Sequence, residues 1–455
     1  MRPEQPIRAL NLPADQAAVR RNNLTVVMRH LQTRGPSSRA SLAAATGIAK
    51  ATISSLVTEL VARGVVRDLG VLDTGRQGRP ASLVALDGRH VVTIGAEINV
   101  DFLAVVVADL AGRIVFERRV PLDLPSTDEG PVLGQLVRLL ETAIVDAAPA
   151  TVAAATVAVS GVVDPATGML RFAPNLGWRE VPIGAHLEHQ LRPSFPITVE
   201  NDANMGAFAE YRHGSHPDTS SLAYVVGAHG IGGGVVLDGN LLRGRRGLGG
   251  EVGHMVLVRD GAACSCGDHG CWETLVGLGA VVHATMPDDA DDVLHDHTIG
   301  PEAKVDAIVQ RLADGDEHVG EALADIGTWL GLGLANLARL VDPDVIVLAG
   351  SFRELAPWIL PAAQAVMDTT GIDARPHGVR VVLSRLGFSA ASLGGAIFAS
   401  EHVFNDPGAL ALRPAAIEPP GEPAGDPAGE PSRKAVDRAY DESLDEVLQI
   451  ATGAG

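Results

Sequence analysis

All three cysteines of this 455-residue chain fall within eight residues, from Cys264 to Cys271, in the stretch CSCGDHGC. Thiolate sulfurs are soft ligands, and Zn²⁺ takes four ligands in a tetrahedron. Cys264, Cys266 and Cys271 supply three of them. His254 upstream and His269 inside the stretch compete for the fourth position. Three clustered cysteines cannot form a disulfide framework, because one would always be left over. Three cysteines and one histidine leave no position for an activated water, so the sequence predicts a structural zinc ion.

The charge of the chain is unevenly distributed. Residues 1–80 contain 12 Lys and Arg against 5 Asp and Glu, whereas the remaining residues contain 24 against 50. A cationic head on an acidic body favours a nucleic-acid-binding head. A basic arm without a partner is the alternative on charge alone.

Three helices are predicted within the head, and the second and third are joined by a tight turn. Leu24, Val27, Met28 and Leu31 recur at helical spacing before Gly35. A short helix follows, with a serine as its N-cap and Gly47 at its end. The next helix carries small, polar or basic side chains on one face. Its opposite face is predicted to be an apolar stripe formed by Ile53, Leu56, Val57, Leu60 and Val61. This order is typical of a helix-turn-helix, whose second helix reads the major groove.

A β-hairpin is predicted after this pair, from residues 65–69 and 81–86. The segment between the two strands is rich in glycine and carries Arg76 and Arg79. An arginine-tipped hairpin is typical of a wing that lies against the phosphates or in the minor groove. The residues expected to contact DNA are Ser38, Arg39, Lys50, Thr52, Ser54, Ser55, Arg76 and Arg79.

Strand and helix patterns occur twice in the body. The expected elements are strands at 90–98, 101–110, 113–122, 151–160, 196–201, 221–227, 233–242, 344–350 and 378–384, with helices at 129–147, 202–214, 321–341 and 391–400 and one more helix between the strands at 344–350 and 378–384. Strand hairpins followed by βα units, repeated, predict two similar α/β lobes with a ligand cleft between them. Residues 286–320 receive no assignment.

Four parts are expected along the chain: a flexible tail at 1–18, a winged helix-turn-helix at 19–87, a two-lobed domain at 88–405 with its zinc loop at 254–273, and a Pro/Gly/acidic disordered tail at 406–455. The sequence has no pattern typical of a signal peptide or a membrane span, which favours a soluble cytoplasmic protein without a membrane partner.

The stretch GEVGHM followed by CSCGDHGCWE resembles the signature of the ROK family of repressors and sugar kinases. The likeness extends through PNLGW at 174–178, ENDAN at 200–204 and HGIGGGVVLDGNLLRG at 229–244. The head resembles the winged helix of ROK repressors. The resemblance covers roughly residues 20–402 and implies a body with an actin-like, ribonuclease H-like fold.

The resemblance also implies roles for individual residues. It makes His254 the zinc-ligand histidine in preference to His269. The positions that match sugar-contacting residues of the family are Asn175, Asn201, Asp202, Glu251, His254 and Glu273. Carboxylates and amides beside a cleft are the usual hydrogen-bonding partners of sugar hydroxyls. In the family's kinases the residue at the Asp202 position is the general base, although a helix N-cap is a second interpretation of that residue.

The nucleotide half of the family pattern is altered in this chain. The kinases' D-x-G-x-T loop corresponds to EINVD, residues 97–101, where Asn99 replaces the glycine and Asp101 the threonine. His229 replaces the threonine of the second phosphate loop, and Ala349-Gly350 replaces a later glycine pair. A carboxylate at position 101 repels nucleotide phosphates. A protein that binds sugar without using ATP would have this pattern, so no catalytic residue is expected.

The sequence therefore predicts a sugar-responsive transcriptional regulator, most simply a repressor that a sugar effector releases from DNA. A homodimer or tetramer would present two heads to a palindromic operator. Two alternatives stay open at this point: an ATP-dependent sugar kinase with a regulatory head, and a constitutive DNA-binding protein whose lobes only dimerise.

Overall fold

The computed structural model describes residues 15–71, 82–122, 128–214, 219–295, 299–370 and 379–412. Contacts divide the chain into two compact units. One unit contains the residues up to Val91 together with those from Glu401 onward, and the other contains Val92–Ser400. The head is thus built from both ends of the chain.

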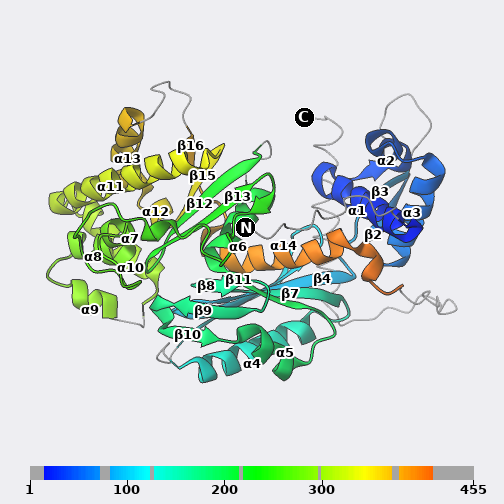
Figure 1. Cartoon of the computed structure of the whole chain (residues 1–455), viewed down its shortest axis with the longest axis horizontal. Coiled ribbons are helices and arrows are strands. Elements are labelled where there is room, and N and C mark those ends of the chain that lie inside the picture. Colours follow the sequence, from blue (N-terminus) through cyan, green and yellow to red (C-terminus); the bar gives the residue numbers. More distant parts are fainter. Residues whose placement is uncertain are drawn as a thin grey trace, which may run out of the picture. The chain divides into compact units, whose positions relative to one another are not determined.

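Three helices and a small sheet form the first unit (Figure 1). They are α1 (Gln16–Arg34), α2 (Arg39–Thr46), α3 (Lys50–Ala62), β1 (Ser37–Ser38), β2 (Val66–Val71) and β3 (Ser82–Leu86). The predicted apolar stripe of α1 is buried. The stripe of α3 is buried at Ile53, Leu56, Val57 and Leu60, whereas Val61 is exposed, because it lies at the edge of that face.

The helix-turn-helix has the predicted turn chemistry. The Ser38 hydroxyl accepts a hydrogen bond from the amide of Ser41 and caps α2, and Gly47 ends α2 with a φ of 73°. Helices α2 and α3 are bent by 118° relative to each other, which lies in the range of a helix-turn-helix pair.

The sheet of the head has the order β1-β3-β2, with antiparallel pairs. Strands β2 and β3 were predicted, but β1 was not, because two residues are too few for a periodic pattern. Arg76 and Arg79, between β2 and β3, lie outside the described residues.

The end of the chain packs on α1 within this unit. Helix α14 (Ala390–Asn405) is followed by the short helix η4 (Pro407–Ala409), and the boundary between the units falls after Ser400. Arg29 of α1 donates to the Glu401 carboxylate at 2.8 Å and to Asn405 Oδ1 at 2.9 Å. Residues 406–412, expected in the tail, are therefore part of the folded head; residues 413–455 lie outside the described residues.

Two five-stranded sheets with the same topology form the second unit. The first contains β4 (Val91–Ile98), β5 (Phe102–Asp109), β6 (Ile114–Pro121), β7 (Thr151–Val159) and β11 (Ile197–Asn201) in the order β11-β7-β4-β5-β6. The second contains β12 (Ser221–Gly227), β13 (Ile231–Leu237), β14 (Asn240–Leu241), β15 (Val345–Gly350) and β16 (Arg380–Leu383) in the order β14-β13-β12-β15-β16. In each, three antiparallel strands precede the last two along the chain. The predicted pair of similar lobes is confirmed as an actin-like, ribonuclease H-like fold.

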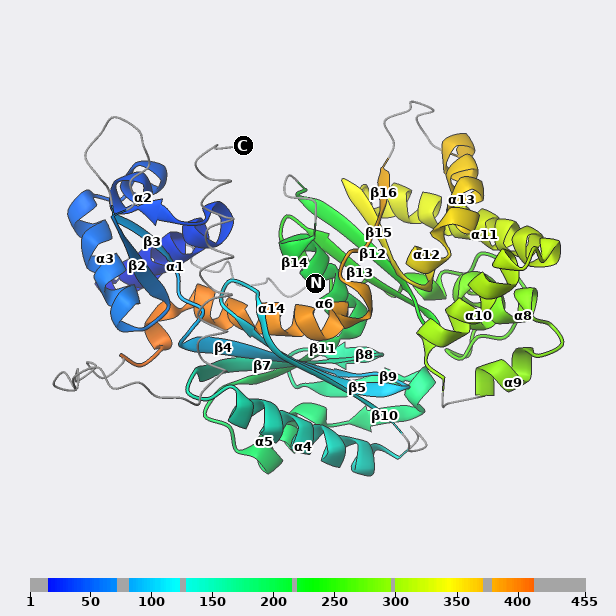
Figure 2. The same cartoon turned by 180° about the vertical axis from the view of Figure 1, so that it is seen from behind.

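Helices cover the sheets (Figures 1 and 2). Helices α4 (Glu129–Asp146) and α5 (Ile183–Leu191) lie on one face of the first sheet. Helices α11 (Glu317–Val341) and α13 (Ala356–Thr370) lie on one face of the second. Helix α6 (Asp202–His213) packs on both sheets through small side chains such as Ala203, Ala207 and Ala209. The first residues of α6 therefore lie where the two lobes meet.

The remaining elements include several that the sequence did not predict. A three-stranded sheet contains β8 (Val162–Asp164), β9 (Met169–Ala173) and β10 (Trp178–Val181). Two helices, α9 (Ala290–His295) and α10 (Pro301–Ala313), occupy the region left without assignment. The others are η1 (Pro174–Leu176), η2 (Val252–His254), α7 (Glu273–Val276), α8 (Leu278–Thr285), α12 (Ser351–Glu354) and η3 (Gly387–Ser389).

No single helix within the described ranges is long and apolar enough to cross a membrane; only α2 and α3 taken together, as a sharply bent pair, meet that criterion of length and composition.

Candidate functional site: a metal cluster beside a polar cavity

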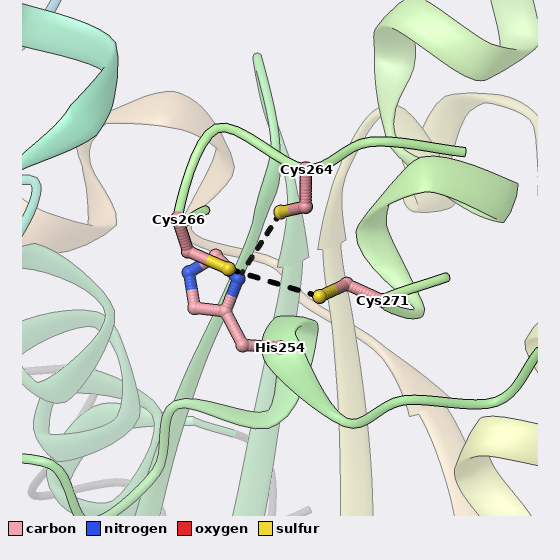
Figure 3. A group of neighbouring side chains, drawn as sticks. All are labelled: His254, Cys264, Cys266 and Cys271. Carbon is pink, nitrogen blue, oxygen red and sulfur yellow. Dashed lines mark hydrogen bonds between the residues drawn. The ribbon is translucent and has the colours of Figure 1, made fainter. Parts of the chain in front are cut away.

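His254, Cys264, Cys266 and Cys271 form one cluster, whose ligand atoms all lie within 4.8 Å of one another (Figure 3). The Sγ atoms of Cys266 and Cys271 are 3.8 Å apart, and Cys264 Sγ is 3.6 Å from His254 Nδ1. Tetrahedral bonds of about 2.3 Å to sulfur and 2.0–2.1 Å to nitrogen place ligands about 3.8 Å and 3.6 Å apart. The four side chains therefore fit a tetrahedral metal ion.

The structure selects His254 over His269 as the fourth member. His269 is exposed and is not part of the cluster. His254 turns Nδ1 toward Cys264, while its Nε2 lies 4.0 Å from the Glu251 carboxylate. A carboxylate facing the second ring nitrogen is the usual way in which a metal-binding histidine is oriented.

The cysteine loop is shaped by its glycines and fixed by one tryptophan. Gly270 has a φ of 67°, and a Cβ atom there would lie 1.7 Å from the Val258 carbonyl oxygen, so only glycine fits. Trp272, next to Cys271, is fully buried and donates its indole N–H to the Trp329 carbonyl of α11 at 3.1 Å. The loop is thereby anchored in the core of the second lobe.

A cavity of about 280 Å³ opens beside the cluster, lined by residues of both lobes. Its volume is near the lower limit for small-molecule pockets. The predicted sugar-binding residues all line it: Asn175, Asn201, Asp202, Glu251, His254 and Glu273. Cys266 also lines it, so the metal cluster forms part of its wall.

Glu273 connects the cysteine loop to the glycine-rich loop before β13. One carboxylate oxygen lies 3.4 Å from Cys264 Sγ, and the other accepts a hydrogen bond from the Ile231 amide at 3.1 Å. A Cβ atom on Gly230 would lie 1.8 Å from that second oxygen. The glycine at 230 is thus required for the approach of Glu273.

Asn201 and Asp202 have different roles at the start of α6: one caps the helix and the other places its carboxylate at the cavity. Asn201, not Asp202, is the N-cap of α6: its Oδ1 accepts from the Asn204 amide at 2.9 Å, and its Nδ2 donates to the Gly161 carbonyl at 3.1 Å. Asp202 is the first helical residue. The N-cap interpretation of Asp202 is therefore wrong, and its carboxylate lines the cavity.

Two of the acids that line this cavity, Asp202 and Glu251, have a raised pKa. Burial raises the pKa of Asp202. The pKa of Glu251 rises to about 7, through burial and the nearby charges of Asp202 and Glu273. These carboxylates suit the task of accepting or donating hydrogen bonds to hydroxyl groups.

The far side of Asp202 faces a second, much smaller cavity of about 50 Å³ that Glu97 and Asn99 help to line. Glu97 is buried and accepts a hydrogen bond from Asn99 Nδ2 at 3.1 Å. Burial, with repulsion from Asp202, raises the pKa of Glu97 to about 8.

Asp101 and His229, the two replacements in the predicted phosphate loops, face each other. Asp101 Oδ1 lies 3.5 Å from His229 Nε2, and the Asp101 side chain is only 7% exposed. The two residues belong to different lobes, one following β4 and the other following β12. Sequence analysis identified each replacement separately but not their contact.

Six of the eight residues predicted to contact DNA lie in α2 and α3 or at the cap of α2, whereas Arg76 and Arg79 lie outside the described residues. Lys50, Ser54 and Ser55 of α3 are exposed, and Thr52 is half-buried. Ser54 donates its hydroxyl to the Lys50 carbonyl at 3.0 Å. Ser38 caps α2, and Arg39 pairs with Asp68 of β2 at 3.1 Å.

Sequence reasoning missed several cavity residues. Ser160, Gly161, Val162 and Phe172 line the cavity, three of them in the turn after β7 and at the start of β8. No charge or spacing distinguishes them. The first and last residues of ENDAN also have a structural role: buried Glu200 pairs with Arg243 and accepts from Asn204 Nδ2 at 3.3 Å.

Comparison with known proteins relates most of this chain to one family. Residues 93–402 match the family described as the ROK family. The xylose repressor of Bacillus subtilis is 27% identical over 390 residues, which cover 86% of this chain and 97% of that protein. A solved ROK family transcriptional regulator, a homologue of the Escherichia coli Mlc protein, matches with a TM-score of 0.71 at 22% identity, over 85% of this chain and 97% of the other. A ROK family glucokinase from Streptomyces griseus, solved with glucose and AMPPNP, matches with a TM-score of 0.57 at 30% identity, over 68% and 99%.

Proposed function

Because the chain belongs to the ROK family, we propose that it is a sugar-responsive, DNA-binding transcriptional regulator, a repressor of carbohydrate-utilisation genes that a sugar effector releases. One observation carries the proposal. The chain joins a helix-turn-helix unit to a polar cavity whose acids and amides suit a sugar. Asp101 and His229, at positions that match the phosphate loops of the family's kinases, face each other at 3.5 Å. The similarity to a xylose repressor across both parts supports it.

The sugar binds in the 280 Å³ cavity through hydroxyl contacts. The residues assigned to it are Asn175, Asn201, Asp202, Glu251, His254 and Glu273. The donor set of His254, Cys264, Cys266 and Cys271 holds a structural Zn²⁺, because three sulfurs and one nitrogen at these spacings suit zinc and leave no open position. The ion would fix His254 and Glu273 at the cavity wall.

The head binds the operator through α3 in the major groove. Lys50, Thr52, Ser54 and Ser55 face the bases or phosphates, Ser38 and Arg39 lie at the start of α2, and Arg76 and Arg79 belong to the wing. A homodimer or tetramer presents two heads to a palindromic operator. Sugar binding acts by its different affinities for the DNA-binding and the released arrangement.

A gel-shift titration tests this function. DNA selected by the protein from a random-sequence pool serves as the probe, and D-xylose, D-glucose and N-acetyl-D-glucosamine are titrated against the complex. One sugar is expected to weaken the complex at least about fivefold. Asp202→Asn should bind the probe like the parent and lose the sugar response, whereas Lys50→Ala with Thr52→Ala should lose the probe and keep the sugar. If no sugar alters DNA binding, the proposal fails.

A sugar kinase is the second candidate, because Asp202 lies at the position of the kinases' general base and faces the cavity. Phosphoryl transfer needs a site for nucleotide phosphates and Mg²⁺ beside that base. Glu97, Asn99 and Asp101 occupy this region instead. An ADP-release assay with the same three sugars and Mg²⁺-ATP separates the two functions, since sugar-dependent turnover that Asp202→Asn abolishes would favour the kinase.

A further inference from the structure

We propose that the effector is an uncharged monosaccharide, and that the Asp101–His229 pair is the specificity determinant that excludes sugar phosphates. This inference rests on the proposed function, since it specifies the ligand of the same cavity. Three features of the second unit support it. They are the charge of the cavity wall, the hydrogen bonds made by the loops that carry Asp101 and His229, and the small volume of the cavity next to Asp202.

The cavity wall offers acidic side chains and no lysine or arginine among the described residues. Among the described residues that line it, the ionisable side chains other than Cys266 are Asp202, Glu251, Glu273, His229 and His254, with no lysine or arginine. Sites for phosphate groups depend on Arg or Lys, on helix N-termini or on free backbone amides. The N-terminus of α6 lies at this cavity, but its Ala203 and Asn204 amides already donate to Asp202 at 2.8 Å and to Asn201 at 2.9 Å. A phosphate with nearly two negative charges would face the carboxyl groups of Asp202, Glu251 and Glu273 without a lysine or arginine to balance it.

Two arginines of the second unit, Arg119 and Arg243, are already bound to acids. Arg119 stacks over the ring of Phe102, 3.6 Å from its centroid, and pairs with Glu302 at 2.7 Å. Arg243 pairs with the buried Glu200. A bound phosphate would have to break a charge-assisted hydrogen bond to recruit either guanidinium.

Backbone amides of the glycine-rich loop at the start of β13 are also already hydrogen-bonded within the protein. The Ala228 amide donates to the Gly230 carbonyl at 2.9 Å, and the Ile231 amide donates to Glu273 at 3.1 Å. Amides of such a loop would be the natural donors to a phosphate. In this chain two of them hold the loop and Glu273 in place.

Asp101 engages the imidazole of His229. It faces His229 Nε2 at 3.5 Å, so the imidazole is directed to a carboxylate of the other lobe. The second carboxylate oxygen of Asp101 is buried without a hydrogen-bond partner among the described residues. Asp101 lies behind His229, which lines the larger cavity, and so places an acid next to that part of the wall.

The volume of the second cavity also disfavours a phosphate group. The cavity beyond Asp202 measures about 50 Å³ and contains Glu97 and Asn99 in its wall. A neutral hydroxyl fits against such a wall as a hydrogen-bond donor or acceptor, whereas a phosphate group needs both volume and counter-charge.

Calorimetric titration of the full-length protein with matched pairs tests the inference. D-glucose, D-mannose and N-acetyl-D-glucosamine are each compared with their own 6-phosphate, and D-xylose is included. We expect at least one neutral sugar to bind, and its 6-phosphate to bind at least about 100-fold more weakly, as like charges across a poorly solvated gap require. Asp101→Asn should narrow that ratio about tenfold by removing one negative charge. Asp146→Asn, which removes an exposed acid at the end of α4, is the matched control and should leave the ratio unchanged.

The outcomes separate the inference from the proposed function. A 6-phosphate that binds as tightly as its neutral partner, or more tightly, overturns the inference and leaves a sugar-binding regulator. An unchanged ratio in a folded Asp101→Asn protein overturns the role of the pair. If no compound of either kind binds, the proposed function fails and the inference fails with it.

Discussion

At the scale of single residues, the buried acid Glu97 illustrates how the fold holds an unfavourable group. Its carboxyl group is enclosed, one oxygen accepts from Asn99, and the other has no hydrogen-bond partner in the described part of the chain. Burial and the charge of Asp202 raise its pKa to about 8. The folded protein therefore holds a proton on Glu97 that the unfolded chain releases near pH 4.5.

This difference predicts a pH dependence of stability. Because the folded state binds more protons than the unfolded state between about pH 4.5 and pH 8, the contribution of Glu97 is most favourable at low pH and is lost as the pH rises. Glu97→Gln keeps the shape without the charge. Its melting temperature should exceed that of the parent at pH 8, by an amount that corresponds to a few kcal/mol at most, and the gain should vanish near pH 5. Differential scanning calorimetry measures both.

Glu141→Gln, on the exposed face of α4, is the matched control and should show no pH-dependent gain. Equal gains for Glu97→Gln at pH 5 and pH 8 would contradict the assignment of the raised pKa to this carboxyl group.

The metal-binding residues could be predicted and the Asp101–His229 pair could not, for a physical reason. The cysteines lie within one loop, so their spacing along the chain determines their distances in space. Asp101 and His229 come from loops of different lobes, and only the packing of the two sheets brings them to 3.5 Å. Asn201 and Asp202 are adjacent at the helix start, and sequence alone does not decide which of two good capping residues takes the N-cap.

At the scale of elements, the cysteine loop between η2 and α7 connects the metal cluster to the cavity. The Trp272 amide donates to the Met255 carbonyl at 2.8 Å, and the Leu257 amide donates to the Gly270 carbonyl at 2.9 Å. These bonds join the two ends of the loop. The four metal-binding side chains also converge within it. Glu273 and His254 are positioned by this loop rather than by a regular sheet or a long helix.

Metal removal should therefore weaken sugar binding before it affects DNA binding. A chelator that strips the cluster is expected to reduce sugar affinity at least about tenfold, in line with the usual effect of losing groups that orient a site. Affinity for DNA without sugar should stay within about twofold, since the head is a separate unit. Calorimetry and gel shift give the two values, and the metal content is measured in parallel.

Re-addition of Zn²⁺ is the control for this prediction and should restore sugar affinity. Unchanged sugar affinity in a protein shown to be free of metal would separate the cluster from the cavity.

Long elements were predicted well and short ones poorly. Strand β12 matches the predicted residues 221–227, and α6 differs from its prediction at one end by a single residue. Strands β1, β8 and β14 have only two or three residues, too few to show a period. Helices α9 and α10 lie in an acidic segment in which the local composition masks the apolar face of α10.

At the scale of the whole molecule, the head depends on the last helix of the chain. Arg29 contacts Glu401 and Asn405, and its guanidinium lies 5.0 Å from the centroid of the Phe404 ring. Thr25 donates its hydroxyl to the Asn405 carbonyl at 3.1 Å. Arg63 at the end of α3 donates to the Leu410 carbonyl. A head cut from the chain at Val91 would lose all of these partners.

A double-mutant cycle measures this dependence. Arg29→Ala and Glu401→Ala should each destabilise the head by about 1–2 kcal/mol, because each leaves a half-buried charge without its partner. The double variant should cost less than the sum of the two. Hydrogen exchange of the α1 amides reports the stability of this unit alone.

Arg21→Ala, at an exposed position of the same helix, is the control and should leave exchange unchanged. Strict additivity of Arg29→Ala and Glu401→Ala would show that the two side chains do not interact.

The two-ended construction of the head has a consequence for protein synthesis. A ribosome makes α1 first and Glu401 some 370 residues later, so the nascent DNA-binding unit waits for its final contacts until the body has been synthesised. Prematurely terminated chains that lack α14 would carry an incomplete head. Only molecules that already contain the effector-binding body would then bind the operator. Truncated products, which could not respond to the sugar, would not repress the genes.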